Sequence, residues 1–183
     1  INAPIGIFDS GLGGLSVTKE IIEFLPGESI IYLADSKNAP YGEKSKEEII
    51  QFSIKNTELL LGLGCKLIVV ACNTATTNAI KILRDKYDVA FIGIEPAIKP
   101  AALNTKTGKI GVLATRGTLA SELFLSTSSK FNDVEFIEVE GKGLVTLIEA
   151  GKIEETKPLL KKYLLPMIEK GTDKIVLGCT HYP

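Results

Sequence analysis

Two cysteines stand where a thiol could take part in chemistry. Cys72 follows the apolar segment 67–71, and Cys179 follows a similar segment, 175–178. Short runs rich in β-branched residues are typical of buried strands in a parallel sheet. Ligands of α/β proteins bind at the carboxyl ends of such strands, so the sequence predicts that both thiols border a binding site.

The residues after Cys72 favour a reactive thiol. A helix is expected to follow, with Thr74, Thr76 or Thr77 as its cap, and the free N–H groups at its start would stabilise a thiolate or a substrate carboxylate. A thiol with an ordinary pKa of about 8.5 could then act as a general base near neutral pH. The alternative is a purely structural cysteine, because free cysteines are among the most buried residues.

The second half of the chain repeats the first. Residues 110–117 (IGVLATRG) align with IGIFDSGL at the start, and IVLGCTHY near the end aligns with VVACNTAT around Cys72. Ser10 lies 62 positions before Cys72, and Thr115 lies 64 positions before Cys179. Two matches in the same order predict two related α/β halves. If the halves face each other about a pseudo-twofold axis, the two thiols lie on opposite sides of one cleft.

Two opposed thiols allow a reaction that one thiol does not. One can remove a proton from a stereocentre while the other delivers a proton to the opposite face, which inverts the centre. A redox pair and a nucleophile with a resolving cysteine are the alternatives. Four flanking residues weigh against both, because their neutral or switchable hydrogen bonds suit a small charged molecule: Asn73, Thr74, Thr180 and His181. His181 could assist proton transfer at Cys179, or it could simply be packed.

The elements that must hold these residues alternate between strand and helix. Strands are expected at residues 5–9, 29–35, 67–71, 90–95 and 136–139, and helices after the glycine turn, after Ser45, and over 143–151 and 154–170. The predicted fold class is therefore α/β, with mostly parallel sheets and three layers in each half. Two pseudo-symmetric domains are expected, residues 1–97 and 98–183, with the active site in the cleft between them.

The expected helices carry signals of their own. Ser45 and Glu48 have the spacing of a capping box at the start of one helix. Pro166 should kink or interrupt the last helix. The apolar side of the first helix is expected to consist of Leu15, Ile22 and Leu25.

Other polar residues fall at the same edge of the predicted sheet. Asp9 and Ser10 end the first strand, before glycines that let backbone N–H groups approach a ligand. The sequence DSGLGG matches neither a P-loop nor G-x-G-x-x-G, so a nucleotide site is disfavoured, and a tight turn capped by serine is the structural alternative. Tyr41 is either a surface aromatic or a hydroxyl donor that closes over a ligand. Glu149 would ordinarily be solvated.

Composition favours small ligands over macromolecules. The chain has 183 residues, 45% of them hydrophobic, and a net charge of −1, as expected of a soluble globular protein. No basic cluster suggests nucleic acid, and no apolar run approaches the roughly 20 residues of a membrane helix. A single histidine and no C-x-x-C pair argue against a metal site, and Cys65 lies too far from Cys72 to share one. Three cysteines, an odd number, suit a reducing cytoplasm.

Four motifs in this order, DSGLGG, PYG, ACNTAT and GCTHYP, resemble the glutamate racemases, which are cofactor-independent bacterial enzymes. The resemblance implies that Cys72 takes the proton from D-glutamate and Cys179 takes it from L-glutamate. It makes Asp9, Glu149 and His181 auxiliary residues around the thiols. The positions that it implies for holding the amino acid are Asp9, Ser10, Tyr41, Gly42, Asn73, Thr74, Thr115, Thr118, Thr180 and His181.

The same resemblance implies a cellular role. The family supplies D-glutamate for peptidoglycan, works in the cytoplasm without a cofactor or metal, and commonly forms homodimers. Its members continue past GCTHYP, so the second domain is expected to be incomplete at its C-terminal end and to leave apolar surface uncovered.

Other functions remain open at this point. An aspartate racemase or another racemase of the same superfamily is the nearest alternative. A non-catalytic amino-acid-binding module is a different one, although a pure binder needs neither thiol. A pyridoxal enzyme is disfavoured because Lys66 and Lys174 begin their strands and so lie at the wrong end of the sheet.

Overall fold

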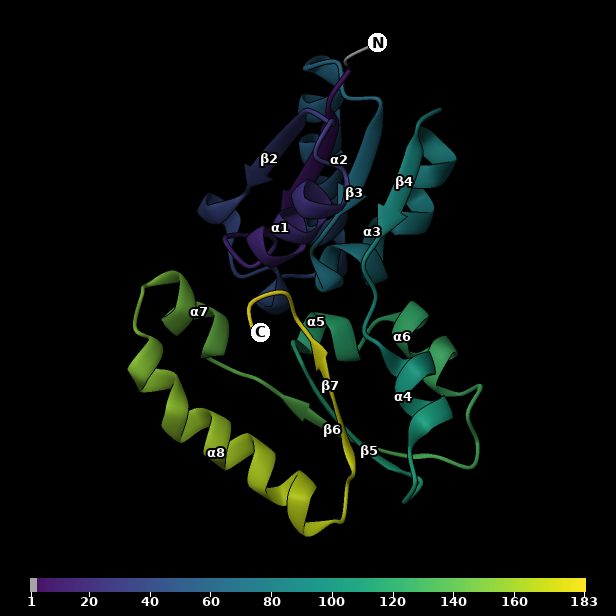
Figure 1. Ribbon diagram of the computed structural model, residues 1–183, viewed down its shortest axis with the longest axis vertical. Coiled ribbons are helices and arrows are strands. Elements are labelled where there is room, and N and C mark those ends of the chain that lie inside the picture. The colour runs from purple at the N-terminus through teal and green to yellow at the C-terminus, as the bar shows by residue number, and fades with distance from the viewer. Residues whose placement is uncertain (1–2) are drawn as a thin grey trace.

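The computed structural model describes residues 3–183 and contains two parallel sheets, one in each half of the chain (Figure 1). The first has the order β2-β1-β3-β4, from β1 (Ile5–Asp9), β2 (Ile30–Ala34), β3 (Leu67–Val70) and β4 (Ala90–Gly93). The second has the order β6-β5-β7, from β5 (Lys109–Ala114), β6 (Glu135–Glu140) and β7 (Lys174–Gly178). The α/β prediction with parallel sheets is confirmed.

Helices cover both faces of the first sheet. Side chains alternate along β1, so that Ile5 and Ile7 face α1 (Leu15–Phe24) on one side. Phe8 faces the other side, in the larger core shared with α2 (Lys46–Gly62) and α3 (Asn73–Lys86). The 3-10 turns η1 (Ser36–Asn38) and η2 (Tyr41–Glu43) connect β2 to α2.

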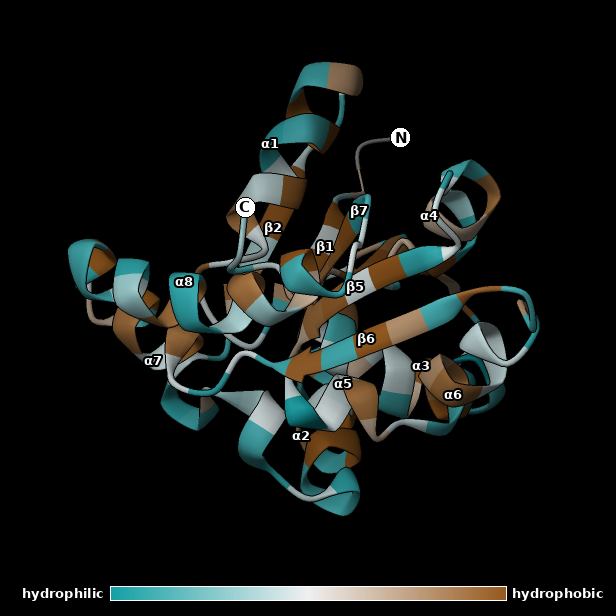
Figure 2. Ribbon diagram, turned by 90° about the horizontal axis from the view of Figure 1, so that it is seen from below, coloured by the Kyte–Doolittle hydropathy of each residue, from teal (hydrophilic) through white to brown (hydrophobic). Residues whose placement is uncertain are grey.

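The second sheet is layered in the same way. Ile110 and Val112 of β5 face a core with Ile98 of α4 (Ile98–Asn104) and Phe124 of α6 (Glu122–Ser128). Leu113 faces the opposite core, beneath α7 (Leu144–Glu149) and α8 (Ile153–Glu169). Figure 2 shows β5 as a mostly hydrophobic strand between these helices. No helix within residues 3–183 is long and apolar enough to cross a membrane.

The edge strand β7 is less completely covered. Its Val176 faces the core with α4, but Ile175 and Leu177 on the other face are 39% and 42% exposed. Among residues 3–183, β7 pairs only with β5, so its outer side has backbone groups without a neighbouring strand.

The capping prediction for α2 is confirmed. The Glu48 N–H donates to Ser45 Oγ at 3.2 Å, and the Ser45 N–H donates to Glu48 Oε2 at 2.9 Å. This reciprocal pair satisfies two of the free N–H groups at the helix start.

The predicted apolar side of α1 is not the side that packs on the sheet. Leu15, Ile22 and Leu25 are all about half exposed, at 47%, 51% and 45%. Val17 and Ile21 pack against the sheet instead. The helix carries two apolar stripes, and the one with Val17 and Ile21 brings Thr18 into the core, where its hydroxyl donates to Gly14 O at 2.9 Å.

Pro166 does not interrupt the last helix, because α8 runs without a break from Ile153 to Glu169. A proline inside a helix costs about 3 kcal/mol. Met167 is fully buried in the core beneath α7 and α8, and Leu159 and Leu160 are partly buried against it. Full burial of a side chain of this size stabilises the fold by about 1.5–3 kcal/mol, and the partly buried leucines add to this. The packed face therefore outweighs the missing backbone hydrogen bond.

Candidate active site between the two halves

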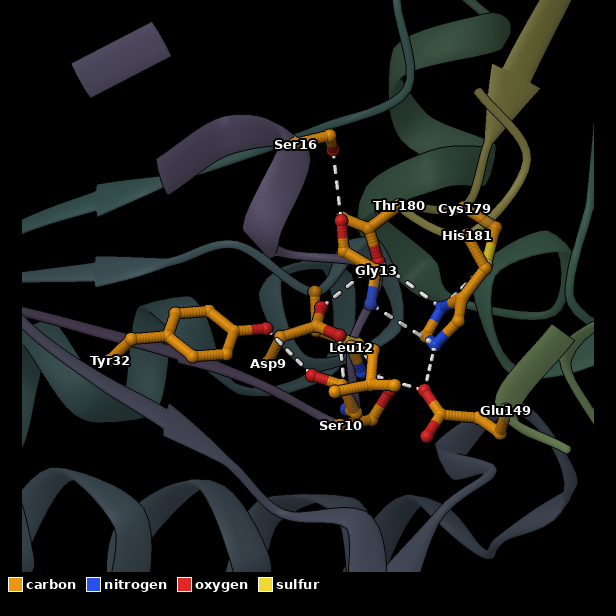
Figure 3. A network of polar contacts seen from close by, with 12 residues as sticks. Asp9, Ser10, Leu12, Gly13, Ser16, Tyr32, Glu149, Cys179, Thr180 and His181 are labelled. Atoms are coloured by element: carbon orange, nitrogen blue, oxygen red, sulfur yellow. Dashed lines mark hydrogen bonds and ion pairs between the residues drawn. The ribbon is translucent and has the colours of Figure 1, made fainter. Parts of the chain in front are cut away.

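The carboxyl ends of strands from both sheets meet at one place. Asp9 ends β1, Cys72 follows β3 and Cys179 follows β7. Asp9 Oδ1 accepts a hydrogen bond from the Thr180 hydroxyl at 3.0 Å, which joins the two halves (Figure 3). Both thiols are almost fully buried, with 4% of Cys72 and 8% of Cys179 exposed. Burial and a charge on Cys72 both raise the pKa of Cys179, so the thiols interact electrostatically.

Cys72 itself caps α3. The helix begins at Asn73, directly after the thiol, and Cys72 Sγ accepts a hydrogen bond from the Ala75 N–H at 3.4 Å. The three threonines predicted as caps lie inside the helix, so that prediction is wrong: Thr74, Thr76 and Thr77. Because strand and helix are joined with almost no loop, the thiol occupies the position where helix N–H groups favour a negative charge.

The surroundings of Cys72 act on its protonation in opposite directions. Burial and the Asp9 carboxylate raise the pKa of the Cys72 thiol to about 12. The hydrogen bonds from Ala75 and Ser10 lower it, and Ser10 Oγ lies 3.7 Å from Cys72 Sγ. Removal of the thiol proton therefore needs an added positive charge, such as a bound ammonium group.

Cys179 has a histidine beside it. His181 Nδ1 lies 3.7 Å from Cys179 Sγ, and His181 Nε2 lies 2.5 Å from Glu149 Oε1. Because a carboxylate only accepts hydrogen bonds, the contact with Glu149 assigns the proton of a neutral imidazole to Nε2. Nδ1 is then free to accept the thiol proton. The Gly13 N–H, 3.3 Å from Nε2, could donate to it only in the other tautomer.

The glycine turn after β1 receives side chains from the second half. The Leu12 N–H donates to Glu149 Oε1 at 2.6 Å (Figure 3). A Cβ atom at Gly11 would lie 2.1 Å from Glu149 Oε1, and one at Gly13 would lie 2.5 Å from His181 Nδ1. A side chain at either position would displace Glu149 or His181, because these side chains of the second half lie directly against the backbone of the turn.

Three threonines predicted to hold the amino acid come together across the junction. Thr74 Oγ1 of α3 lies 2.8 Å from Thr115 Oγ1 and 3.1 Å from Thr118 Oγ1, at the start of α5 (Arg116–Leu119). Thr115 and Thr118 are also 3.1 Å apart. All three are buried, so these hydroxyls form a closed ring of hydrogen bonds.

Tyr41 is neither a surface aromatic nor free to offer its hydroxyl. Only 1% of it is exposed, its hydroxyl donates to Asp35 Oδ2 at 2.5 Å, and it accepts a hydrogen bond from Asn56 Nδ2 at 2.9 Å. The adjacent Gly42 carries the contact with the second half, because a Cβ atom there would lie 2.5 Å from Thr115 Cβ. Asn73 Nδ2 donates to the Ile94 carbonyl at 3.0 Å.

Similarity to known proteins identifies the family of this chain. The family model described as Asp/Glu/Hydantoin racemase matches residues 5–183. The chain belongs to the Asp/Glu/hydantoin racemase family. The glutamate racemase of Herpetosiphon aurantiacus is 50% identical over 183 residues, which cover 98% of this chain and 72% of that protein. The glutamate racemase of Clostridium perfringens strain SM101 is 50% identical over 186 residues, covering 100% of this chain and 72% of that protein.

Solved racemase structures share the fold. Escherichia coli glutamate racemase, in complex with L-glutamate and the activator UDP-MurNAc-ala, has a TM-score of 0.85 and 38% identity, over 99% of this chain and 71% of that one. The Francisella tularensis glutamate racemase, in complex with D-glutamate, has a TM-score of 0.85 and 33% identity, over 100% and 70%. PH1733, an aspartate racemase homologue from Pyrococcus horikoshii, matches at 17% identity and a TM-score of 0.57, which shows the fold alone.

Several residues of this racemase site were not predicted from its sequence. Tyr32 donates its hydroxyl to the Gly11 carbonyl at 2.6 Å, and Asp35 and Asn56 hold Tyr41. The sequence predicts Tyr32 in a strand and Asn56 in a helix, and nothing near either residue indicates a role in the site. Within residues 3–183, no cluster of three or more His, Cys, Asp or Glu side chains is placed to bind a metal ion.

Proposed function

We propose that the chain interconverts L-glutamate and D-glutamate, with Cys72 and Cys179 acting in turn as base and acid. The observation that carries the proposal is that two buried thiols end equivalent strands of two different sheets, each with its own hydrogen-bond partner. The names of the relatives, which are glutamate racemases at 50% identity, support glutamate as the substrate.

The reaction moves one proton off the α-carbon and one proton onto it. In the direction from L- to D-glutamate, the Cys179 thiolate takes the α-proton as the C–H bond breaks, and the electron pair stays on the α-carbon. The Cys72 thiol then gives its proton to the opposite face. Each turnover leaves the thiols with exchanged protonation states, and the reverse reaction uses the same groups in the opposite order.

The neighbours of the thiols supply what this chemistry needs. His181 can accept the proton of Cys179 at Nδ1 while its Nε2–H stays bonded to Glu149. At the other thiol, the negative charge of Asp9 raises the pKa of Cys72 and so strengthens its thiolate as a base. The ammonium group of a bound amino acid would offset the cost of making either thiolate, because an opposite charge nearby favours the ionised form.

The remaining predicted residues are proposed to hold the amino acid. The near-complete burial of both thiols means that the halves must part to admit a ligand. The hydroxyls of Thr74, Thr115 and Thr118 could then turn from one another to a ligand carboxylate, for which they offer three donors. The other proposed contacts are Asp9, Ser10, Gly42, Asn73, Thr180 and His181, together with the backbone of Tyr41, whose hydroxyl is already held by Asp35 and Asn56.

The proposal extends to the role of the protein in the cell. Its domains are residues 1–97 and 98–183, with the substrate between them. The product D-glutamate would enter peptidoglycan synthesis in the cytoplasm, and the active form would be a homodimer that uses no cofactor. The domain bounds rest on the repeat in the sequence, and the other points rest on the family resemblance.

Racemisation measured by circular dichroism tests the proposal. The parent chain should convert either glutamate enantiomer to the racemate and should convert aspartate far more slowly. Cys72→Ser and Cys179→Ser should each abolish racemisation, because a hydroxyl is barely acidic beside a thiol. In deuterium oxide, each variant should still exchange the α-proton of one enantiomer.

Turnover near the parent rate in either cysteine variant would refute the two-thiol mechanism. Faster racemisation of aspartate than of glutamate would assign the chain to a different substrate. Binding of glutamate without turnover by the parent would make it an amino-acid-binding module.

A further inference from the structure

Asn78 joins the two halves beside the threonine ring. It lies on α3, one helical turn after Thr74, and its side-chain amide donates to two carbonyl oxygens. Asn78 Nδ2 is 2.9 Å from the Thr74 oxygen and 2.9 Å from the Gly117 oxygen of α5. Because an amide nitrogen has two N–H groups, this residue uses one on its own helix and the other across the junction.

The junction at Gly117 leaves no room for adjustment. A Cβ atom at Gly117 would lie 2.9 Å from Thr74 Cγ2 and 3.4 Å from Gly42 Cα. The backbone of α5 therefore rests directly on the first turn of α3, and Asn78 fixes its position from the side.

The separation of α3 and α5 sets the geometry of the hydroxyl ring. Thr74 belongs to α3, whereas Thr115 and Thr118 belong to the start of α5. Their Oγ1 atoms lie 2.8–3.1 Å apart, close to the range of good hydrogen bonds between hydroxyls. A shift of α5 by a few tenths of an ångström would therefore lengthen and weaken these hydrogen bonds.

We infer that Asn78 is a positioning residue that holds the threonine hydroxyls at the spacing that a substrate carboxylate requires. The inference rests on the proposed function, in which those hydroxyls bind the amino acid. Neither thiol is a hydrogen-bond partner of Asn78. Asn78 therefore acts on substrate binding, through Thr74 and Gly117, and not on proton transfer.

Replacement of the amide by a carboxylate of the same size tests this role. Asn78→Asp removes both N–H groups and points a negative charge at two carbonyl oxygens. The KM for both enantiomers should rise by about 10- to 100-fold, the factor that corresponds to one or two lost hydrogen bonds, while kcat stays within about threefold. The Kd for glutamate from isothermal titration, which needs no turnover, should rise by the same factor.

Asn104→Asp is the matched control. Asn104 makes the same kind of bond, from Nδ2 to the Pro100 carbonyl four residues earlier at 2.8 Å, but on the exposed side of α4 and away from the junction. The KM, kcat and Kd of the Asn104→Asp variant should equal those of the parent. If Asn78→Asp does not fold, as judged by far-ultraviolet circular dichroism, Asn78→Ala replaces it with the same expected rise in KM and Kd.

Parent values of KM and Kd in the folded Asn78 variant would overturn the inference, as would a fall in kcat at constant KM. Failure of the proposed function looks different, because the parent chain itself would then neither racemise glutamate nor bind it.

Discussion

Cys72 and Cys179 end equivalent strands, yet their partners come from different places. The Ala75 N–H and the Ser10 hydroxyl, which contact Cys72, both belong to the first half of the chain, as the thiol does. Cys179 depends on His181, which is bonded to Glu149. Glu149 in turn accepts a hydrogen bond from Leu12, in the other half.

The two thiol sites therefore differ in whether they need contact between the halves. The Cys72 site is formed within one half, so it would keep its contacts if the halves part as proposed. The Cys179 site reaches its fixed geometry only when Leu12 and Glu149 meet across the junction. Two repeated halves can thus place two similar thiols, of which only one is coupled to closure.

The largest expected effect comes from the residue that serves Cys179 alone. His181→Asn should lower kcat/KM about 10³-fold, within the range for loss of a general base. Both directions must slow equally, because the equilibrium constant between enantiomers is one. The difference between the thiols should therefore appear in deuterium oxide, where exchange of the D-glutamate α-proton through Cys72 should persist. Equal loss of exchange for both enantiomers would contradict the separation of the two sites.

Gly11→Ala should disrupt closure without touching either thiol. The added methyl group would lie 2.1 Å from Glu149 Oε1, so the carboxylate must leave Leu12 or the turn must move. Displacement of a catalytic group by about 1 Å can cost about 100-fold in rate, and kcat/KM should fall by that factor. Gly27→Ala is the control, because nothing lies within 4 Å of a Cβ atom there. A parent rate in Gly11→Ala would show that the Leu12 contact is dispensable.

A smaller effect is expected on the Cys72 side. Ser10→Ala removes one hydroxyl 3.7 Å from Cys72 Sγ and should lower kcat/KM by about 10-fold, as expected for one hydrogen bond to a group that becomes charged. Ser16→Ala removes a hydroxyl that donates to the Gly13 carbonyl at 2.9 Å on the exposed side of the same turn, and it should have no effect. Slow exchange of the D-glutamate α-proton in Ser10→Ala would locate the effect at Cys72, and slow exchange of the L-glutamate α-proton would contradict it.

The smallest difference between the two sites is expected in the pH dependence of stability. Burial raises the pKa of Cys72 to about 12 and also raises the pKa of Cys179, so both thiols stay neutral in the folded chain while they ionise in the unfolded chain. The unfolded state then binds fewer protons, and the free energy of unfolding should fall as the pH rises from about 9 towards 12. Denaturant titrations of Cys72→Ser and Cys179→Ser should each show a flatter decline, and a steeper decline in either variant would contradict the neutral buried thiol.

The strands and the two thiols could be predicted because their signals are local. The apolar segments 67–71 and 175–178 are each followed by a cysteine and then by polar residues. The end of such a strand can be located from these neighbouring residues alone. The parallel order of the first sheet brings Asp9 and Cys72 to one edge, and the contact between Thr180 and Asp9 brings the end of β7, with Cys179, to the same place.

The details that could not be predicted depend on contacts between distant segments. The orientation of α1 is decided by whether Val17 or Leu15 meets the sheet, and both stripes fit a helix. The hydroxyl of Tyr41 faces Asp35 and Asn56 because of how η2 packs, which no spacing in the sequence encodes. The role of each side chain at the junction was predicted from family motifs and remains a proposal.

The burial of both thiols also limits their exposure to damage. Only a thiolate reacts quickly with peroxides, disulfides or alkylating reagents, and the closed chain keeps Cys72 and Cys179 both protonated and out of solvent. If the halves part to admit a substrate, as proposed, oxidation should proceed only while they are apart. The rate at which iodoacetamide labels these thiols should then measure how often the two halves separate. A bound ligand that keeps the halves together should slow the labelling.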